Sequence, residues 1–482
     1  MALLSCFRLA AAPALLAALL LGASACSGEN EEPAAADTAR YAATARYAAT
    51  ENAPPTPPPP PATAVQVVDG DTRKPVRRAR VVARGGSVRA TPKGLAALGI
   101  PRHRYEVLVS APGYAARSVK LDFHRRLSHR VEIWRPSLQW PLYGANPART
   151  QAQGGIQVRP PFRIAWRREI GGLMEFPATT WEGVAYVHTM GGTLRAISMQ
   201  NGRVLWKQEV GSLMASSPAI DPERGVLVST SMQPGYVTVR SLETGKLRWR
   251  YYTGLAEPSP VIRDGVAYFG ATNGNVYALD LDKRKPRWIF HGGVKITSSP
   301  ALVGNRLYFG DYAGRVFALD SRNGRVIWRG SAGGRVYGTV AVAGGRLFAP
   351  SVFSGLSALS ARNGRLLWRI SAGSYVYSSP AAYKGRVYFG AYNGLVYAVS
   401  AGSGRIVWTR GAGGRVSGAV QVVDGLVYAA SLEGRTTAWN WKTGSTVWTF
   451  PHGKYVPVSG SGERLLLHGA TELFAVEHKR QR

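Results

Sequence analysis

Five residues at a regular forty-residue spacing are the strongest candidates for binding chemistry in this chain. They are Lys295, Arg335, Tyr375, Arg415 and Tyr455. Converging ammonium and guanidinium groups bind carboxylate, phosphate or sulfate through charge-assisted hydrogen bonds, and tyrosine adds stacking for a sugar or an aromatic ring. We therefore predict a ligand site if a repeating fold gathers these side chains at one channel mouth. The alternative is that they belong to arginine-rich turns that point separately into solvent.

The net charge of the chain also indicates anionic partners. Its 482 residues include 60 Lys and Arg against 28 Asp and Glu, which gives a formal charge of +32. Such a field attracts phospholipid head groups, anionic polymers or nucleic acid. The basic residues are spread through the chain and form no stripe with interleaved aromatics, as a nucleic-acid surface requires. We expect no nucleic-acid partner.

The residue types that support metal or redox chemistry are sparse. The two cysteines, Cys6 and Cys26, lie in the first 26 residues, so no zinc or iron–sulfur site can form from the rest of the chain. Glu175 and Glu257 fall on expected inner strands and Asp311 on a turn, whereas a calcium site needs several converging oxygens. We expect no metal, no cofactor and no catalytic residue.

The histidines show no pairing with a nucleophile and no metal-ligand spacing. We expect seven of the eight to be surface or turn residues: His103, His124, His129, His188, His291, His452 and His468.

Eight tryptophans recur at about forty residues and predict the fold. Each repeat contains four short apolar segments separated by glycine-rich turns, which is typical of one propeller blade. The chain ends with three strands, near residues 473–476, and residues 162–166 supply the missing outer strand. We predict an all-β fold with an eight-bladed propeller over residues 136–482, closed by its two ends. The tryptophans are Trp166, Trp206, Trp249, Trp288, Trp328, Trp368, Trp408 and Trp448.

The repeated phrase resembles a known family. Ala318, Gly324 and Trp328 show the spacing of the tryptophan-docking motif in quinoprotein (PQQ-like) propellers, and residues 140–150 resemble the lead-in of that family. The resemblance implies that the tryptophans are structural wedges between blades, although Arg284 stands where one repeat should carry glycine. It also implies an alternative function, a PQQ- and calcium-dependent dehydrogenase of alcohols or sugars.

Non-catalytic members of this superfamily include the propeller lipoprotein of the outer-membrane assembly machinery, which is a scaffold. The chain resembles that lipoprotein more than a dehydrogenase, because its propeller contains no cysteine pair and no long loop insertions. It differs in carrying an additional N-terminal region.

The N-terminal region divides into three parts. Residues 1–25 have the pattern of a lipoprotein signal peptide, with cleavage before a lipidated Cys26. The residues before Cys26 also fit an ordinary export site, which would leave a free thiol. Residues 26–63 form an Ala- and Pro-rich tether. Residues 64–135 resemble the carboxypeptidase-regulatory-like (transthyretin-like) domain, an Ig-type β-sandwich.

These observations together favour an exported, lipid-anchored, extracytoplasmic protein. We expect a monomeric, non-catalytic scaffold that binds a protein or an anionic polymer of the cell envelope.

Overall fold

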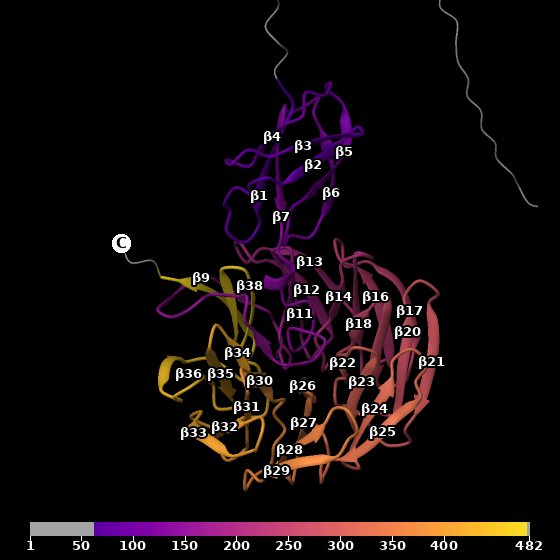
Figure 1. Ribbon diagram of the computed structural model, residues 1–482, viewed down its shortest axis with the longest axis vertical. Coiled ribbons are helices and arrows are strands. Elements are labelled where there is room, and N and C mark those ends of the chain that lie inside the picture. The colour runs from indigo at the N-terminus through magenta and orange to yellow at the C-terminus, as the bar shows by residue number, and fades with distance from the viewer. Residues whose placement is uncertain (1–61, 480–482) are drawn as a thin grey trace, which may run out of the picture. The chain divides into compact units, whose positions relative to one another are not determined.

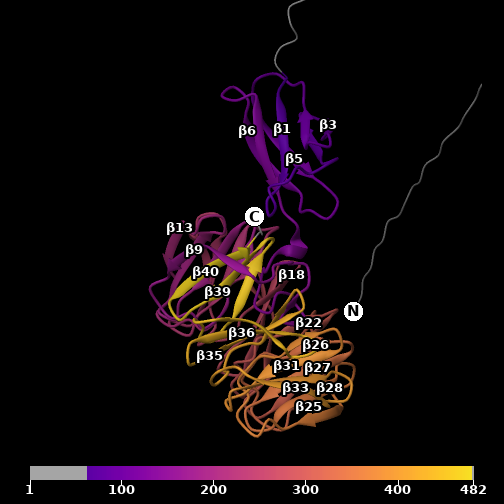
Figure 2. The same ribbon diagram turned by 90° about the vertical axis from the view of Figure 1, so that its left-hand side faces the viewer.

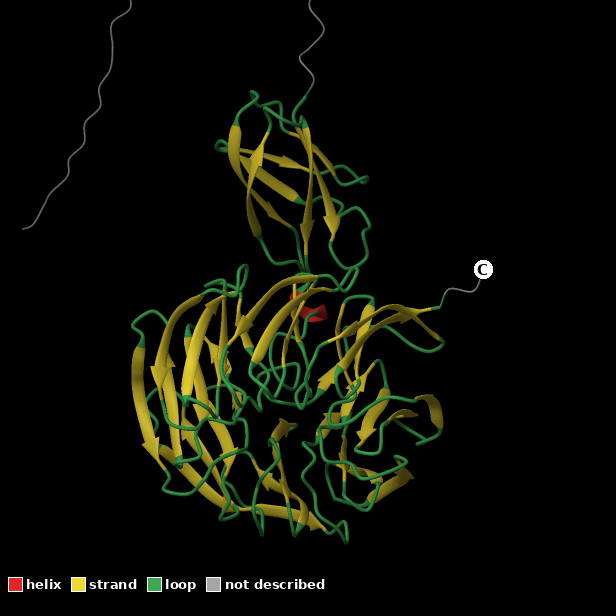
Figure 3. Ribbon diagram, turned by 180° about the vertical axis from the view of Figure 1, so that it is seen from behind, coloured by secondary structure: helices red, strands yellow, loops and turns green. Residues whose placement is uncertain are grey.

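β-strands make up nearly all of the regular structure. The computed structural model describes residues 62–479, so the expected signal segment (1–25), Cys26 and most of the tether lie outside the described residues. One short 3₁₀ helix, η1 (Pro136–Leu138), accompanies the strands in this range (Figure 3). The all-β prediction is confirmed.

The N-terminal two-sheet unit (residues 64–135) has a core of its own. Alternating apolar side chains such as Val65, Val81 and Val107 point inward from both sheets and are fully buried. One sheet has the order β4-β1-β7 and the other β3-β2-β5-β6. The strands are β1 (Ala64–Asp69), β2 (Arg80–Ala83), β3 (Gly86–Arg89), β4 (Leu95–Ala97), β5 (Arg104–Ser110), β6 (Arg117–Asp122) and β7 (Ser128–Ile133).

The remaining chain forms eight further sheets that follow one another around a common centre (Figure 1). In seven of them four consecutive strands pair in chain order, from the innermost to the outermost strand. Their bounds are β10 (Thr179–Trp181), β11 (Val184–His188), β12 (Thr193–Ser198), β13 (Val204–Glu209); β14 (Ala219–Asp221), β15 (Val226–Thr230), β16 (Tyr236–Ser241), β17 (Leu247–Tyr252); β18 (Val261–Arg263), β19 (Val266–Gly270), β20 (Asn275–Asp280), β21 (Lys285–His291); β22 (Ala301–Val303), β23 (Arg306–Gly310), β24 (Arg315–Asp320), β25 (Val326–Ser331); β26 (Ala341–Ala343), β27 (Arg346–Ser351), β28 (Gly355–Ser360), β29 (Leu366–Ile370); β30 (Ala381–Tyr383), β31 (Arg386–Gly390), β32 (Leu395–Ser400), β33 (Ile406–Gly411); and β34 (Gln421–Val423), β35 (Leu426–Ser431), β36 (Arg435–Asn440), β37 (Thr446–Phe450).

The eighth sheet is built from both ends of this region. It contains β38 (Val458–Ser461), β39 (Arg464–His468), β40 (Glu472–His478) and, as its outer strand, β9 (Phe162–Glu169). β40 and β9 run antiparallel and side by side (Figure 2), with Ala475 opposite Trp166. The early strand therefore lies where the sequence analysis placed it, and the last sheet gains a fourth strand that protects its edge.

Five of the eight repeated tryptophans connect one sheet to the next by a hydrogen bond. Trp328 lies opposite Ala318 within its own sheet, and its indole N–H donates to the carbonyl of Ala361 in the following sheet at 3.1 Å. A Cβ on Gly364 would lie 2.4 Å from this indole, and Gly364 has φ of +74°. The tryptophan thus requires glycine in its neighbour. Four other indoles make the same bond, those of Trp166, Trp288, Trp368 and Trp408.

The repeat that carries Arg284 in place of glycine also differs in its structure. Arg284 occupies the glycine position with φ of +58°, which costs a non-glycine residue about 1 kcal/mol. The tryptophan of the preceding sheet, Trp249, is only half-buried, and its indole nitrogen has no hydrogen-bond partner among the described residues. This junction therefore lacks the close contact between indole and glycine that Trp328 makes with Gly364.

Substituting Gly364 by Ala tests the docking contact. We expect a loss of about 2–3 kcal/mol in unfolding free energy, because the new methyl group collides with the Trp328 indole as well as straining the backbone. Gly385→Ala is the matched control, since its φ is +77° and open space surrounds its Cβ direction. Equal losses for the two variants in urea unfolding would contradict the docking role.

The segment 139–153 closes one end of the central channel. Its backbone meets the innermost strands of successive sheets in turn, because its carbonyls accept hydrogen bonds from their amides. Pro141 receives a bond from Ile220, Pro147 from Leu302, Ala148 from Val342, Thr150 from Ala382 and Gln151 from Val422, at 2.8–2.9 Å. Trp140 pairs with Thr180 of β10, and β8 (Ala152–Gln153) runs parallel to β34. One short segment therefore joins most of the sheets.

Arg149 extends the contacts of the closing segment to the sheet that begins with β18. Its guanidinium is fully buried and donates to the carbonyls of Ser259, Pro260 and Pro300 at 2.9 Å, and to that of Tyr143. Burial lowers the pKa of Arg149 to about 9, so the side chain keeps its charge at neutral pH. A buried cation that is satisfied by backbone carbonyls alone tolerates no apolar replacement.

Replacing Arg149 by Met should therefore destabilise the fold by about 3 kcal/mol or more, because four buried carbonyls lose their donor. Arg362→Met removes an exposed arginine and should change the melting temperature little. A similarly small change for Arg149→Met would show that the closing segment does not depend on this side chain.

Candidate functional site

A funnel at the centre of the ring is the candidate site. It is blind, because Tyr143 of the closing segment lies at its floor and donates a hydrogen bond to Ser379 at 2.9 Å. Its inner part encloses about 50 Å³. The wall comes from the residues that precede each innermost strand: Glu175, Phe176, Glu257, Thr297, Tyr337, Tyr377, Ser417 and Tyr455.

Two carboxyl groups face the inside of this funnel. Burial, together with the nearby charge of Glu257, raises the pKa of Glu175 to about 7. Burial likewise raises the pKa of Glu257, and the ammonium of Lys295 opposes that rise from 3.9 Å away. Glu175 makes no ion pair and no side-chain hydrogen bond within residues 62–479. Glu257 therefore has a cationic partner in Lys295, whereas Glu175 has none among the described residues.

Tyrosine rings line the funnel and continue to its mouth. The rings of Tyr337 and Tyr377 meet edge to face with centroids 5.2 Å apart, and that of Tyr392 lies 4.8 Å from Tyr377. At the rim, Tyr375 packs against Phe353 at 5.5 Å, and these side chains are 47% and 63% exposed. A continuous aromatic surface thus runs from solvent into the hub.

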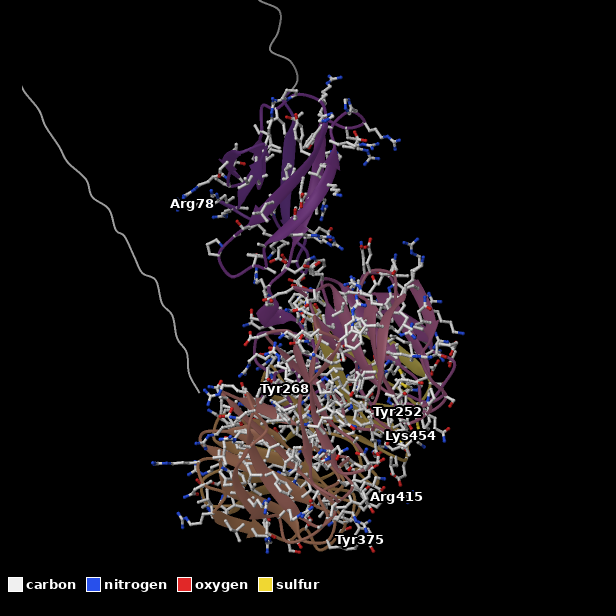
Figure 4. All side chains as sticks on the ribbon, turned by 90° about the vertical axis from the view of Figure 1, so that its right-hand side faces the viewer. Arg78, Tyr252, Tyr268, Tyr375, Arg415 and Lys454 are labelled. Atoms are coloured by element: carbon white, nitrogen blue, oxygen red, sulfur yellow. The ribbon has the colours of Figure 1, made fainter. Side chains whose placement is uncertain are left out.

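Four of the five sequence-predicted residues occupy equivalent backbone positions. The carbonyls of Lys295, Arg335, Tyr375 and Arg415 each accept a hydrogen bond from the amide seventeen residues later, at 2.9–3.0 Å. Tyr455 lines the funnel wall. Figure 4 shows Tyr375 and Arg415 on the same side of the sheets, together with Tyr252 and Lys454. The forty-residue spacing therefore corresponds to one face of the ring.

The cationic side chains do not form a uniform ring. Lys295 and Arg335 both lie over the ring of Tyr312, at 5.0 and 4.9 Å from its centroid. Arg415 instead donates to Glu433 at 2.9 Å. Binding of an anion by these residues remains a prediction.

The sequence analysis missed part of the site. Tyr337 and Tyr377 lie two residues after Arg335 and Tyr375, so the same forty-residue spacing could have identified them. Tyr143 could not be found this way, because it comes from outside the repeats. Glu175 and Glu257 were expected on inner strands, and both side chains do line the hub.

The interpretation of two histidines was wrong. His188 and His468 are 5% and 1% exposed, not surface residues. They end β11 and β39 at the position where β19, β23 and β31 carry glycine, so the larger side chain is enclosed by the sheets. Burial lowers the pKa of His188 to about 4 and that of His468 to about 3, so both are neutral at physiological pH. They contribute packing rather than chemistry.

The hub does not fit a quinone held by calcium. No group of three or more His, Cys, Asp or Glu side chains within residues 62–479 is arranged to hold a metal ion.

The charge on Glu175 should make stability depend on pH. Its pKa rises from 4.5 to about 7 on folding, so its contribution is complete below pH 4.5 and is lost as pH rises to 7. At about 1.4 kcal/mol per pKa unit the loss is on the order of 3 kcal/mol. Glu175→Gln should remove this contribution from the slope in urea unfolding between pH 4.5 and 7 and leave those of other buried groups such as Asp71 and His188, whereas exposed Glu243→Gln should keep it. An unchanged slope in Glu175→Gln would contradict the buried placement.

Comparisons with known proteins agree with this architecture. The family model described as "Outer membrane protein assembly factor BamB" matches residues 162–291, 223–339 and 353–481. The outer membrane protein assembly factor BamB of Yersinia pestis is 27% identical over 143 residues, covering 26% of this chain and 36% of the relative. That of Moranella endobia is 27% identical over 142 residues, with the same coverage. The chain thus spans about a third of the curated relatives it matches.

Solved structures show the same fold. BamB from Moraxella catarrhalis superposes with a TM-score of 0.57 at 15% identity, over 67% of this chain and 99% of that structure. A europium-containing methanol dehydrogenase gives a TM-score of 0.63 at 13% identity, over 71% and 98%. At such identities the likeness concerns the β-propeller fold alone. Because the family model covers well over half of its residues, the chain belongs to the family of the outer membrane protein assembly factor BamB.

Proposed function

We propose that this protein is a non-catalytic scaffold of the cell envelope that binds outer-membrane assembly proteins through the funnel-side face of its propeller. Membership of the assembly-factor family supports this function. The exposed aromatic rim is the structural feature that carries it, because Phe353 and Tyr375 are the residue types that dominate protein interfaces.

Under this proposal, the domains are those that the sequence predicts. The eight four-stranded sheets act as an eight-bladed propeller, and the N-terminal two-sheet unit is a carboxypeptidase-regulatory-like sandwich that serves as a spacer or second binding module. After cleavage of the signal peptide, a lipid on Cys26 tethers the monomer to a membrane by way of the proline-rich segment. Within residues 62–479 no helix has the length and apolarity needed to cross a bilayer.

The alternative function is a quinone- and calcium-dependent dehydrogenase of alcohols or sugars. The fold is shared with methanol dehydrogenase. The two-carboxylate set of the hub favours the scaffold instead. An anionic envelope polymer is the other partner that the cationic rim could bind.

Variants of the rim test the scaffold function. Phe353→Ser combined with Tyr375→Ser should reduce co-purification of crosslinked outer-membrane assembly proteins at least about tenfold, since buried aromatic anchors contribute about 2 kcal/mol or more. Ile327→Ser, which changes an exposed apolar residue on outer strand β25, should keep co-purification at the wild-type level.

Two results would contradict the proposal. One is equal capture of assembly proteins by the rim variant and the wild type. The other is dye reduction by the purified protein when quinone, Ca²⁺ and an alcohol or sugar are added, which would establish the dehydrogenase.

A further inference from the structure

The sign of the charge changes along the funnel. Its rim carries Lys295 and Arg335, but its inner wall carries Glu175 and Glu257. Residues that were expected to bind an anion therefore surround an entrance that leads to two carboxyl groups. A ligand that reaches the floor meets negative charge and aromatic rings.

One contact within the chain shows how an ammonium group interacts with a carboxylate and an aromatic ring at this site. The ammonium of Lys295 lies 3.9 Å from the Glu257 carboxylate and 5.0 Å from the centre of the Tyr312 ring. Ammonium groups gain both from an opposing carboxylate and from the face of an aromatic ring. Lys295 reaches Glu257 from the rim, and its side chain is 41% exposed, so it leaves the inner cavity free.

Glu175 has no such partner. It is partly buried in the wall, next to the charge of Glu257, and no cation of the described chain pairs with it. Ionisation of an unpaired buried carboxyl is costly, and a proton or an incoming cation relieves that cost. Burial and the Glu257 charge raise the pKa of Glu175 to about 7, so at neutral pH a bound cation would displace a proton from it.

The groups that line the funnel determine which type of cation it can bind. The cavity is lined by carboxylate and hydroxyl oxygens, which favour a head group with N–H donors over a quaternary ammonium that has none. A primary ammonium has three donors, which match carboxylate oxygens and tyrosine hydroxyls. The aromatic wall above, from Tyr377 to Tyr375, suits the alkyl stem that follows.

We propose that the funnel binds a primary alkylammonium, with Glu175 and Glu257 as its anionic contacts and tyrosine rings around its stem. The ammonium comes from a free amine or from a lysine side chain that a partner protein inserts into the hub. This proposal does not rest on the scaffold function, because binding of the small molecule requires no partner.

Calorimetric titration of the full-length protein with n-butylammonium at pH 7 tests the proposal. We expect saturable binding at millimolar or lower concentration, with proton release that appears as a difference between PIPES and HEPES buffers, neither of which contains a primary amine. Glu175→Gln should weaken binding roughly tenfold or more and abolish the proton release, since a charged hydrogen bond contributes about 1.5–3 kcal/mol. Glu433→Gln is the matched control, because that carboxylate pairs with Arg415 away from the funnel wall.

The Lys295→Met variant distinguishes a cation-binding funnel from an anion-binding one. Removal of the competing ammonium should leave butylammonium binding equal or tighter, whereas an anion site would lose affinity for inorganic phosphate. Tetramethylammonium should bind more weakly than butylammonium. A peptide Ala-Lys-Ala with blocked ends, compared with its acetyl-lysine form, distinguishes a lysine side chain from a free amine as the source.

Three results would overturn the proposal. They are no binding of butylammonium below ~10 mM, binding that Glu175→Gln leaves unchanged, and binding of Ca²⁺ or phosphate in place of the amine. Melting curves of each variant establish that it is folded. Failure here would leave the rim-variant experiment on assembly proteins unaffected.

Discussion

Contact between the indole of one sheet and the glycine of the next is the constraint on which the rest of the structure depends. A four-stranded sheet of this size buries little surface by itself, so it must pack face to face with two neighbours. The indole supplies apolar area and one directed hydrogen bond, as from Trp328 to the carbonyl of Ala361. Gly364 makes the close approach possible. Repetition of this joint sets the angle between successive sheets and so the width of the hub.

The closing segment turns a channel into a site. A hub of eight innermost strands leaves an opening at each end, and segment 139–153 fills one of them. Arg149 can bridge several sheets because a guanidinium offers five donors in a fixed plane. The funnel thus has a floor, and groups on its inner wall are shielded from water. That shielding explains the raised pKa of Glu175.

The repeats made much of this structure predictable. The forty-residue period placed strands, turns and the equivalent backbone positions of Lys295, Arg335, Tyr375 and Arg415 correctly, since a residue's place in the repeat sets its place in the sheet. The period did not predict the direction in which each side chain points. Arg415 turns to Glu433, whereas Lys295 turns to Glu257, because different neighbours attract them.

Features outside the repeats were not predictable. Arg149 binds only backbone carbonyls, so no pattern of side chains marks its partners. Glu175 and Glu257 are far apart in sequence, and only the closed ring brings both to one cavity. The burial of His188 was predictable, because His188 occupies the position in its repeat that Gly270 occupies in a later one, and this position is buried.

A crystal structure of the mature protein would test the central claim most directly, because it shows whether the hub is a funnel with one closed end. The account predicts that the Arg149 guanidinium contacts the carbonyls of Ser259, Pro260 and Pro300, with Tyr143 forming the floor below the two glutamates. An open channel through the ring, with segment 139–153 outside it, would contradict the account.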